Sequence, residues 1–188
     1  MKTNKLEQLN PCGNALRWAK TQRSNQQAWD NCDRGDWMLW LVGKLSGNPA
    51  SESRKKVVLA ACDCAELALI HASKGESRPK IAIDTARKWA KGDPSVSLQN
   101  VMAAAYAASA ASAYAASASY AADAYAASYA AYAAYAAAYA AYADAYAAAY
   151  AYAAAYAAYA DADAAARSKV LKQCADIIRR YYPKVPSL

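Results

Sequence analysis

The sequence predicts an all-α protein, a compact multi-helix bundle in which a Trp-rich helical first half packs on antiparallel Ala/Tyr-rich helices. Nowhere do branched apolar residues alternate with polar residues in the pattern that is typical of strands. Neither glycine nor proline occurs from residue 95 to residue 182. Alanine, the strongest helix former, is the commonest residue of that stretch.

The aromatic residues divide the chain of 188 residues into two parts. All five tryptophans lie in the first half, whereas fourteen of the sixteen tyrosines lie between Tyr106 and Tyr159. We therefore expect a Trp-containing helical subdomain at residues 1–94 and an Ala/Tyr-rich helical subdomain at residues 95–188. A chain of this length can bury a sizeable core, and we expect the two parts to form one cooperative domain.

Short helices fill the first half. Residues 14–20 and 26–32 predict two of them, and residues 35–47 predict a third that is apolar on nearly all sides. Asp36 is a good N-cap for this third helix, and Gly-Asn-Pro at residues 47–49 ends it. Its apolar surface indicates the central buried helix of this half.

A longer helix is expected over residues 51–73, capped by Ser51 or Ser53. His71, the only histidine, falls in its last turn, where an imidazole is more often a helix cap than a catalyst. The apolar stripe of this helix consists of Val58, Cys62, Ala65 and Leu69.

Three further helices are expected. Two lie outside the tyrosine-rich stretch, and one leads into it. One covers residues 79–91, and Asp93 then caps the next helix with Pro94 in its first turn. The last helix is amphipathic and ends before Pro183. Its inward positions are Val170, Cys174, Ile177 and Ile178.

The tyrosines from residue 125 onward recur about every 3.5 residues, which is the spacing of one helical face. Tyr132, Tyr139 and Tyr146 lie seven residues apart, and Tyr152 leaves this register. Each ring can bury ~150–200 Å², so packed rings are more plausible than a disordered tract.

A repeat of ADAY, 21 residues apart, indicates that this stretch folds back on itself as successive antiparallel helices. The proposed N-caps are Asp123, Asp144, and Asp161 or Asp163. One continuous helix keeps the same stripe, because 21 residues are three heptads.

Charge, cysteines and motifs limit the function. Residues 101–166 carry four Asp and no Lys or Arg, so a groove that follows a nucleic acid backbone is not expected.

Five cysteines and a polar N-terminus indicate a cytoplasmic protein whose thiols are reduced and buried. Cys62 and Cys64 point ~200° apart on a helix, so we expect neither a metal nor a cofactor. No hydrolase, P-loop, zinc-protease or dinucleotide fingerprint is present, which argues against an enzyme, and no membrane segment is expected.

The chain contains, in this order, the blocks CGNALRWAK, WDNCDRGDWMLWLVGKL, KKVVLAACDCAELAL, AIDTARKWAKGDPS, an Ala-rich stretch and QCADIIRRYYP. Together they resemble a family of predicted immunity proteins of bacterial polymorphic-toxin systems, the fifth such family named, which has bacteriophage relatives. The resemblance covers nearly the whole chain, although family members often carry His, Asp or Arg where this chain carries tyrosine. The matched positions, several of them structural, are Trp18, Asp36, Trp37, Trp40, Cys62, Cys64, Trp89, Asp176, Arg179 and Arg180.

The resemblance implies a non-enzymatic binding protein of immunity or anti-defence type, which neutralises a toxin or host factor by occlusion. Its partner is expected to be a protein. Two alternatives stay open: a Tyr-lined pocket that sequesters a small nucleotide, and a Tyr-faced helical homodimer. The residues predicted to contact a partner or ligand are Tyr132, Tyr139, Tyr146, Tyr152, Arg179 and Arg180.

Overall fold

The computed structural model describes residues 3–48, 51–72, 74–118 and 164–187. These residues form eight α-helices, one 3₁₀ turn and no strand, which confirms the predicted all-α class. The elements are α1 (Thr3–Gln8), α2 (Gly13–Lys20), α3 (Asn25–Asn31), α4 (Gly35–Leu45), α5 (Glu52–Glu66), η1 (Leu69–His71), α6 (Arg78–Ala90), α7 (Leu98–Ala118) and α10 (Ala164–Tyr181). The tyrosine stripe and its proposed Asp caps lie at residues 119–163, outside the described residues.

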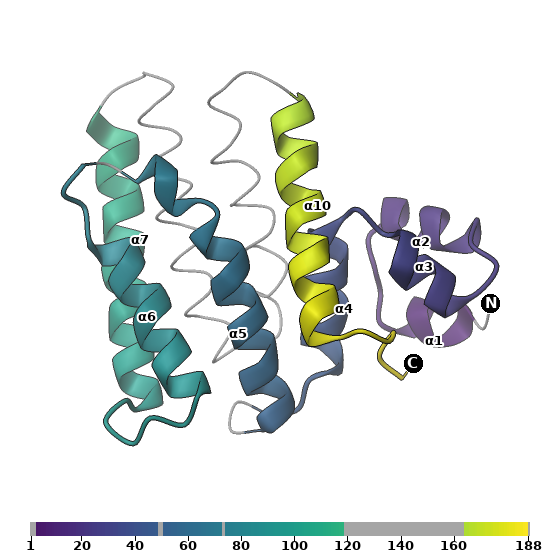
Figure 1. Ribbon diagram of the computed structural model, residues 1–188, viewed down its shortest axis with the longest axis horizontal. Coiled ribbons are helices and arrows are strands. Elements are labelled where there is room, and N and C mark those ends of the chain that lie inside the picture. Colours follow the sequence, from purple (N-terminus) through teal and green to yellow (C-terminus); the bar gives the residue numbers. More distant parts are fainter. Residues whose placement is uncertain (1–2, 49–50, 73, 119–163, 188) are drawn as a thin grey trace.

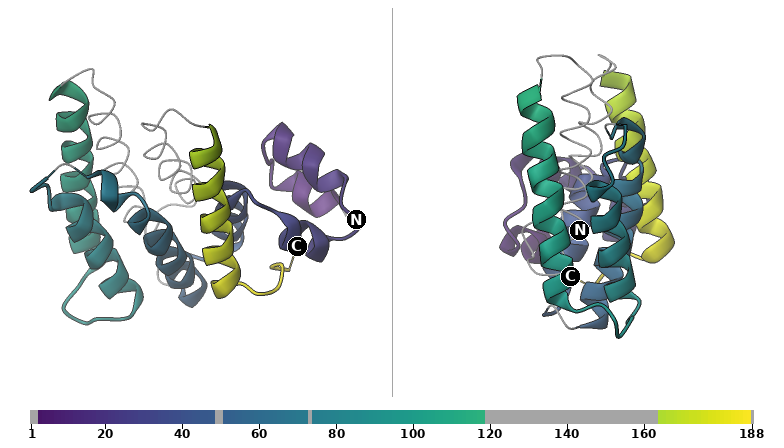
Figure 2. Two further views of the ribbon diagram at one scale, coloured as in Figure 1. Left: turned by 45° about the horizontal axis from the view of Figure 1, so that its top comes forward. Right: turned by 90° about the vertical axis from the view of Figure 1, so that its left-hand side faces the viewer.

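The long helices stand side by side in the spatial order α7, α6, α5, α10 and α4 (Figure 1). The short helices α1, α2 and α3 form a separate group next to α4 (Figure 1), which the left view of Figure 2 also shows. Helix α10 comes last in the sequence, yet it packs between α5 and α4. The predicted boundary between two subdomains at residue 94 stays a prediction. Helix α10, from the second half of the sequence, packs directly on α4 and α5 of the first half.

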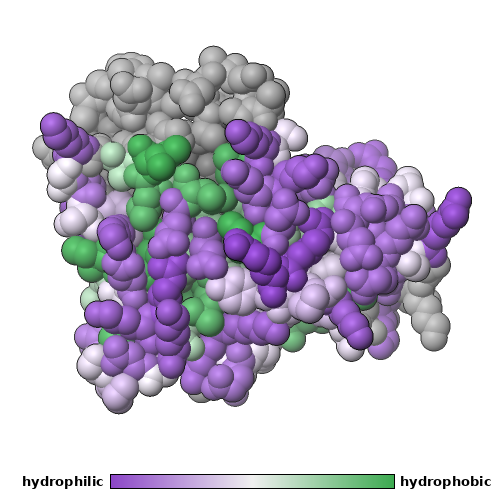
Figure 3. All heavy atoms as spheres, in the orientation of Figure 1, coloured by the Kyte–Doolittle hydropathy of each residue, from purple (hydrophilic) through white to green (hydrophobic). Residues whose placement is uncertain are grey.

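The core lies where α4, α5, α6, α7 and α10 meet. Its fully buried side chains include Leu39, Val57, Val58, Cys62, Ile83, Val101, Cys174 and Ile178. Cys174, Ile177 and Ile178 were predicted to face inward on α10, and the structure confirms them. Figure 3 shows an apolar patch over η1 on an otherwise largely hydrophilic face, where Ile70 is 83% exposed.

The close packing of α4 on α10 depends on Gly35. A Cβ atom at this position would lie 2.4 Å from Cβ of Cys174 and 2.8 Å from the carbonyl oxygen of Leu171. Real Cβ atoms do not approach backbone atoms this closely, so only glycine allows the two helices to meet here.

Some helix ends follow local rules, and others do not. Ser51 caps α5 as predicted, since its Oγ accepts from the main-chain nitrogen of Arg54 at 3.1 Å. The prediction that Asp36 caps α4 is wrong. The helix starts at Gly35, one residue earlier, and Asp36 lies in its first turn with its carboxylate bound by Arg34.

Two more predictions about helix ends are wrong. Asp93 does not cap a helix, because its carboxylate accepts from both the nitrogen and the hydroxyl of Ser95 and forms a local turn. Helix α7 begins only at Leu98. Its start is capped by a reciprocal pair, in which Oδ1 of Asn100 accepts from the main-chain nitrogen of Ser97 and Oγ of Ser97 accepts from the main-chain nitrogen of Asn100. His71 does not end a long helix either, because α5 stops at Glu66 and His71 belongs to η1.

Candidate functional site: a tryptophan-lined pocket

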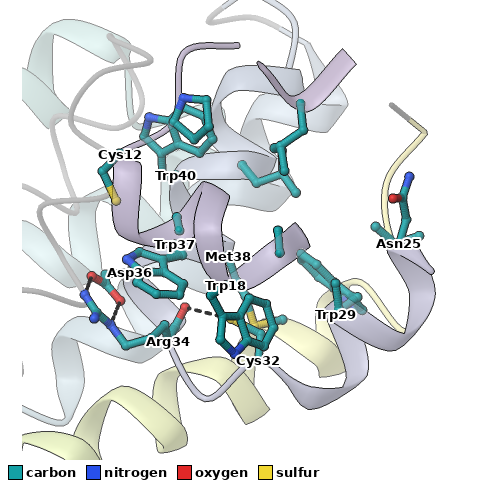
Figure 4. A pocket seen from close by; sticks show the side chains of 17 residues that line it. Cys12, Trp18, Asn25, Trp29, Cys32, Arg34, Asp36, Trp37, Met38 and Trp40 are labelled. Carbon is teal, nitrogen blue, oxygen red and sulfur yellow. Dashed lines mark hydrogen bonds and ion pairs between the residues drawn. The ribbon is translucent and has the colours of Figure 1, made fainter. Parts of the chain in front are cut away.

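A pocket of about 450 Å³ opens between the N-terminal helices and α4 (Figure 4). Four of the five tryptophans line it, and its remaining wall is mostly apolar. The tryptophans are Trp18, Trp29, Trp37 and Trp40. We call this cavity the Trp pocket. Its volume falls within the range of sites that take small ligands or large side chains.

The sequence brings these four rings together from three helices. Trp18 comes from α2, Trp29 from α3, and Trp37 and Trp40 lie three residues apart on α4, one turn from each other. The rings of Trp18 and Trp37 have their centres 5.9 Å apart at an interplanar angle of 54°. Trp29 is 3% exposed, whereas the other three rings are half-buried and present aromatic surface to the pocket.

One ion pair forms the polar edge of the Trp pocket. Arg34 donates from Nε and Nη2 to the two carboxylate oxygens of Asp36, and its guanidinium carbon lies 4.3 Å from the centre of the Trp37 ring (Figure 4). Asp36 is only 7% exposed, so this pairing neutralises a buried charge. The hydrogen bond that Arg34 donates to Asp36 raises the pKa of Arg34, which keeps the guanidinium charged. The two groups satisfy each other, so the pocket wall carries little net charge.

Two cysteines also line the pocket. Cys32 is buried and donates from Sγ to the carbonyl oxygen of Arg34 at 3.6 Å, and burial raises the pKa of its thiol to about 11. Cys12 is exposed, so the prediction that all five cysteines are buried is wrong at this residue. The reason is its position just before α2, on the rim of the pocket.

The segment that follows α10 reaches the pocket as well. Val185 lines the cavity, and its main-chain nitrogen donates to Oε1 of Gln26 on α3 at 3.0 Å. Tyr182 directly follows the last residue of α10, and its carbonyl oxygen accepts from Nε1 of Trp29 at 2.8 Å. The Trp pocket therefore joins residues from both ends of the sequence.

Of the predicted contact residues, the structure describes only Arg179 and Arg180, and neither of them lines this pocket. Tyr132, Tyr139, Tyr146 and Tyr152 lie outside the described residues. Arg179 donates to the main-chain oxygens of Trp29 and Cys32 and to the carboxylate of Asp176, so it connects α10 to the end of α3. Arg180 is exposed on the same turn.

Seven of the ten family-matched positions lie at the Trp pocket or at the core, and the other three, Asp176, Arg179 and Arg180, lie on α10 outside both. Trp18, Asp36, Trp37 and Trp40 line the pocket, and Trp89 is half-buried against the core. Cys62 and Cys64 are fully buried and bond in different directions, toward the main-chain oxygens of Ile83 and Cys174. The described residues contain no group of three or more His, Cys, Asp or Glu that is arranged to hold a metal ion.

Sequence reasoning missed a second polar cluster, which joins α5, α6 and α10. Arg87 donates to Asp63 at 2.9 Å and to Glu66 at 2.7 Å, and the hydroxyl of Tyr181 donates to the other oxygen of Asp63 at 2.8 Å. These partners satisfy one another and indicate a structural role in helix packing. The long sequence separation between Tyr181 and Asp63 left no local signal for it.

Comparison with known proteins adds no relative: no family model, no curated protein and no solved structure matches this chain. The resemblance to immunity proteins therefore stays a prediction. None of the described helices combines the length and the apolar character that crossing a membrane requires.

Proposed function

We propose that this chain is a non-enzymatic binding protein of immunity or anti-defence type, which holds a toxin or host protein at the Trp pocket and neutralises it by occlusion. The observation that carries this proposal is the pocket itself, an apolar cavity of about 450 Å³ whose wall includes four tryptophans. The sequence resemblance to immunity proteins supports the same class of function.

Tryptophan is the side chain most enriched at the energetic centres of protein interfaces, because it buries a large area and loses little conformational entropy. Three of the pocket rings are half-buried, so a partner that covers them removes further apolar surface from water. Since Arg34 and Asp36 already pair with each other, a partner does not have to supply a compensating charge.

The ionisable groups at the pocket favour binding over catalysis. Arg34 and Asp36 are tied together in an ion pair, and burial keeps the Cys32 thiol protonated, since its pKa is about 11. A general base is the usual companion of a nucleophile, and histidine is not among the described residues that line the cavity. The wall therefore suits the apolar surface of a partner.

A charge placed inside the pocket tests the proposal. Ala15 of α2 lines the cavity, so Ala15→Glu introduces an unpaired carboxylate there. The matched control is Ala103→Glu on the exposed surface of α7, away from the pocket. Tagged wild-type and variant chains are used to capture proteins from the lysate of the organism that encodes the chain, and captured proteins are quantified by mass spectrometry.

The proposal expects a partner that wild type and Ala103→Glu retain and that Ala15→Glu captures at least tenfold less. Circular dichroism and thermal melting show whether the Ala15→Glu chain remains folded. Equal capture by Ala15→Glu and wild type would place the interface elsewhere and remove the pocket from the proposed function. No described residue favours the nucleotide or the homodimer alternative, because the tyrosines on which both depend lie outside the described residues.

A further inference from the structure

Residues 183–187 follow α10, and one of them, Val185, contributes to the wall of the Trp pocket. The side chain of Val185 lines the cavity, and its main-chain nitrogen donates to Oε1 of Gln26 at 3.0 Å. Just before it, the carbonyl oxygen of Tyr182 accepts from the indole of Trp29 at 2.8 Å. An irregular peptide segment is thus already bound at the pocket through one aliphatic side chain and two main-chain hydrogen bonds.

The composition of this segment is typical of peptides that bind aromatic surfaces. Pro183 and Pro186 lie three residues apart and enclose Val185. Proline fixes the φ angle, so a segment with two prolines loses less conformational entropy when it binds. Grooves lined by aromatic side chains recognise such Pro-x-x-P segments in several unrelated binding domains.

The pocket has room for more than this one side chain. About 450 Å³ remains with Val185 in place, and the lining extends from Leu6 of α1 to Trp40 of α4. A valine side chain is much smaller than that cavity, so residues 183–187 fill only one side of the site. A longer segment with aliphatic or aromatic side chains can donate a main-chain N–H to Oε1 of Gln26, as Val185 does, and cover the exposed tryptophan surface as well.

We infer that the Trp pocket recognises an irregular, proline-containing peptide segment of a protein partner, and that residues 183–187 are an internal competitor for this site. The inference rests on the proposed function, since it names the chemistry of the partner at the same pocket. An intramolecular competitor lowers the apparent affinity of the site for the partner, because the partner can bind only during the fraction of time in which the site is free. Displacing the segment costs its few contacts, and the partner restores them with its own.

The test uses the internal segment as the probe. In one protein variant, residues 184–187 are replaced by Gly-Ser-Gly-Ser, which keeps Tyr182 and Pro183 and so retains the hydrogen bond to Trp29. The probe is a fluorescein-labelled peptide, PKVPSL, which copies residues 183–188. The control peptide carries Val185→Asp, and fluorescence anisotropy measures binding of both peptides to the variant and to wild type.

The inference expects the replaced chain to bind PKVPSL at least tenfold more tightly than wild type does. It also expects at least tenfold weaker binding of the Asp peptide, and loss of binding when Ala15→Glu is added. Equal binding of the two peptides, equal binding by wild type and the replaced chain, or no binding by the folded replaced chain would overturn it. Near-UV circular dichroism, which reports the packing of the tryptophans, shows whether the replaced chain is folded.

Failure of this inference is distinguishable from failure of the proposed function. If the peptide does not bind but Ala15→Glu still loses a captured partner, the pocket binds a different chemistry and only the inference falls. Light scattering adds a second arm with wild type and the replaced chain. A wild-type dimer that is lost in the replaced chain would show that this segment is exchanged between copies, and it would overturn the assignment to a separate partner.

Discussion

Arg179 donates from Nε to the main-chain oxygen of Trp29 at 3.2 Å, across 150 residues of sequence. A second donor of the same guanidinium reaches the carbonyl oxygen of Cys32. In the opposite direction, the indole of Trp29 donates to the carbonyl oxygen of Tyr182 at 2.8 Å. The end of α3 is therefore held on α10 from both sides, and Trp29 is fixed as a wall of the Trp pocket. Arg179, which the sequence predicted as a partner contact, holds that wall in place.

This arrangement predicts different effects for two neighbouring arginines. Arg179→Lys keeps the charge but replaces a planar fork by a single ammonium group, which cannot reach both carbonyl oxygens. We expect a loss of ~1–3 kcal/mol in the free energy of unfolding, because hydrogen bonds to a charged donor are lost. Urea denaturation followed by tryptophan fluorescence measures it. Arg180→Lys is the control, since Arg180 is exposed one residue further on, and it should stay within ~0.5 kcal/mol of wild type. Equal effects of the two substitutions would contradict the structural role of Arg179.

The contact between α4 and α10 predicts a large effect of one methyl group. Gly35→Ala places a Cβ atom 2.8 Å from both the nitrogen of Ala175 and the carbonyl oxygen of Leu171, so the helices have to separate. We expect destabilisation by ~1–3 kcal/mol from overpacking, and a melting temperature lower by ~2–4 °C for each kcal/mol. Gly13→Ala is the matched control, because no atom lies within 4 Å of the added Cβ. Thermal melting followed by circular dichroism compares the two. A Gly35→Ala chain as stable as Gly13→Ala would show that α4 does not pack this closely on α10.

The sequence predicted the helices well because their signals are local. Ser51 is a strong cap wherever it stands before a helix, and the inward positions of α10 follow from the spacing of Cys174 and Ile178. Asp36 shows where local rules stop. It has the chemistry of a cap, but its burial next to Arg34 decides its partner instead.

The Trp pocket was beyond local rules for a related reason. Three of its four tryptophans, Trp18, Trp37 and Trp40, are family-matched positions, but Trp29 is not. Three separate helices carry the four rings, and the relative placement of α3 depends on Arg179. Val185 enters from the far end of the sequence, and no spacing rule connects it with Trp29. Contacts of this kind are set by the tertiary fold, so sequence periodicity does not reveal them.

The buried thiols predict a loss of stability at alkaline pH. Burial raises the pKa of Cys62 from 9.0 to about 12, and that of Cys32 from 9.0 to about 11. Above pH 9 the unfolded chain loses these protons while the folded chain keeps them, so the unfolded state binds fewer protons and stability falls as pH rises. The stabilisation is complete below pH 9, and for Cys62 it is lost as pH rises toward 12.

Removing one thiol should make this pH dependence less steep. Cys62→Ala is expected to lower stability at neutral pH, because it leaves a small cavity in the core. Between pH 9.5 and 11, however, its stability should fall by ~1.4 kcal/mol less per pH unit than that of wild type. Urea denaturation at several pH values gives both slopes, with Cys12→Ala as the control at an exposed thiol. Parallel slopes for Cys62→Ala and wild type would mean that the Cys62 thiol is not protected by burial.

The burial of the cysteines also predicts selective labelling of one thiol. Cys12 is exposed, whereas Cys32, Cys62, Cys64 and Cys174 are buried. Brief treatment of the folded protein with N-ethylmaleimide should therefore add one group, and treatment in denaturant should add five. Intact-protein mass spectrometry counts the groups, and Cys12→Ser should remain unlabelled while folded. Rapid addition of two or more groups to the native chain would show that the core opens on the timescale of labelling.

The same thiol reports on the Trp pocket, because Cys12 lies on its rim. A group attached there projects over the tryptophans, so labelled protein should capture its partner less well, as Ala15→Glu does, while its melting temperature stays close to that of unlabelled protein. Cys12→Ser treated with the reagent is the control for labelling elsewhere, and it should capture the partner normally. Normal capture by fully labelled wild type would indicate that the partner does not cover this side of the pocket. In that case the site would be restricted to the opposite side, where Val185 and Gln26 lie.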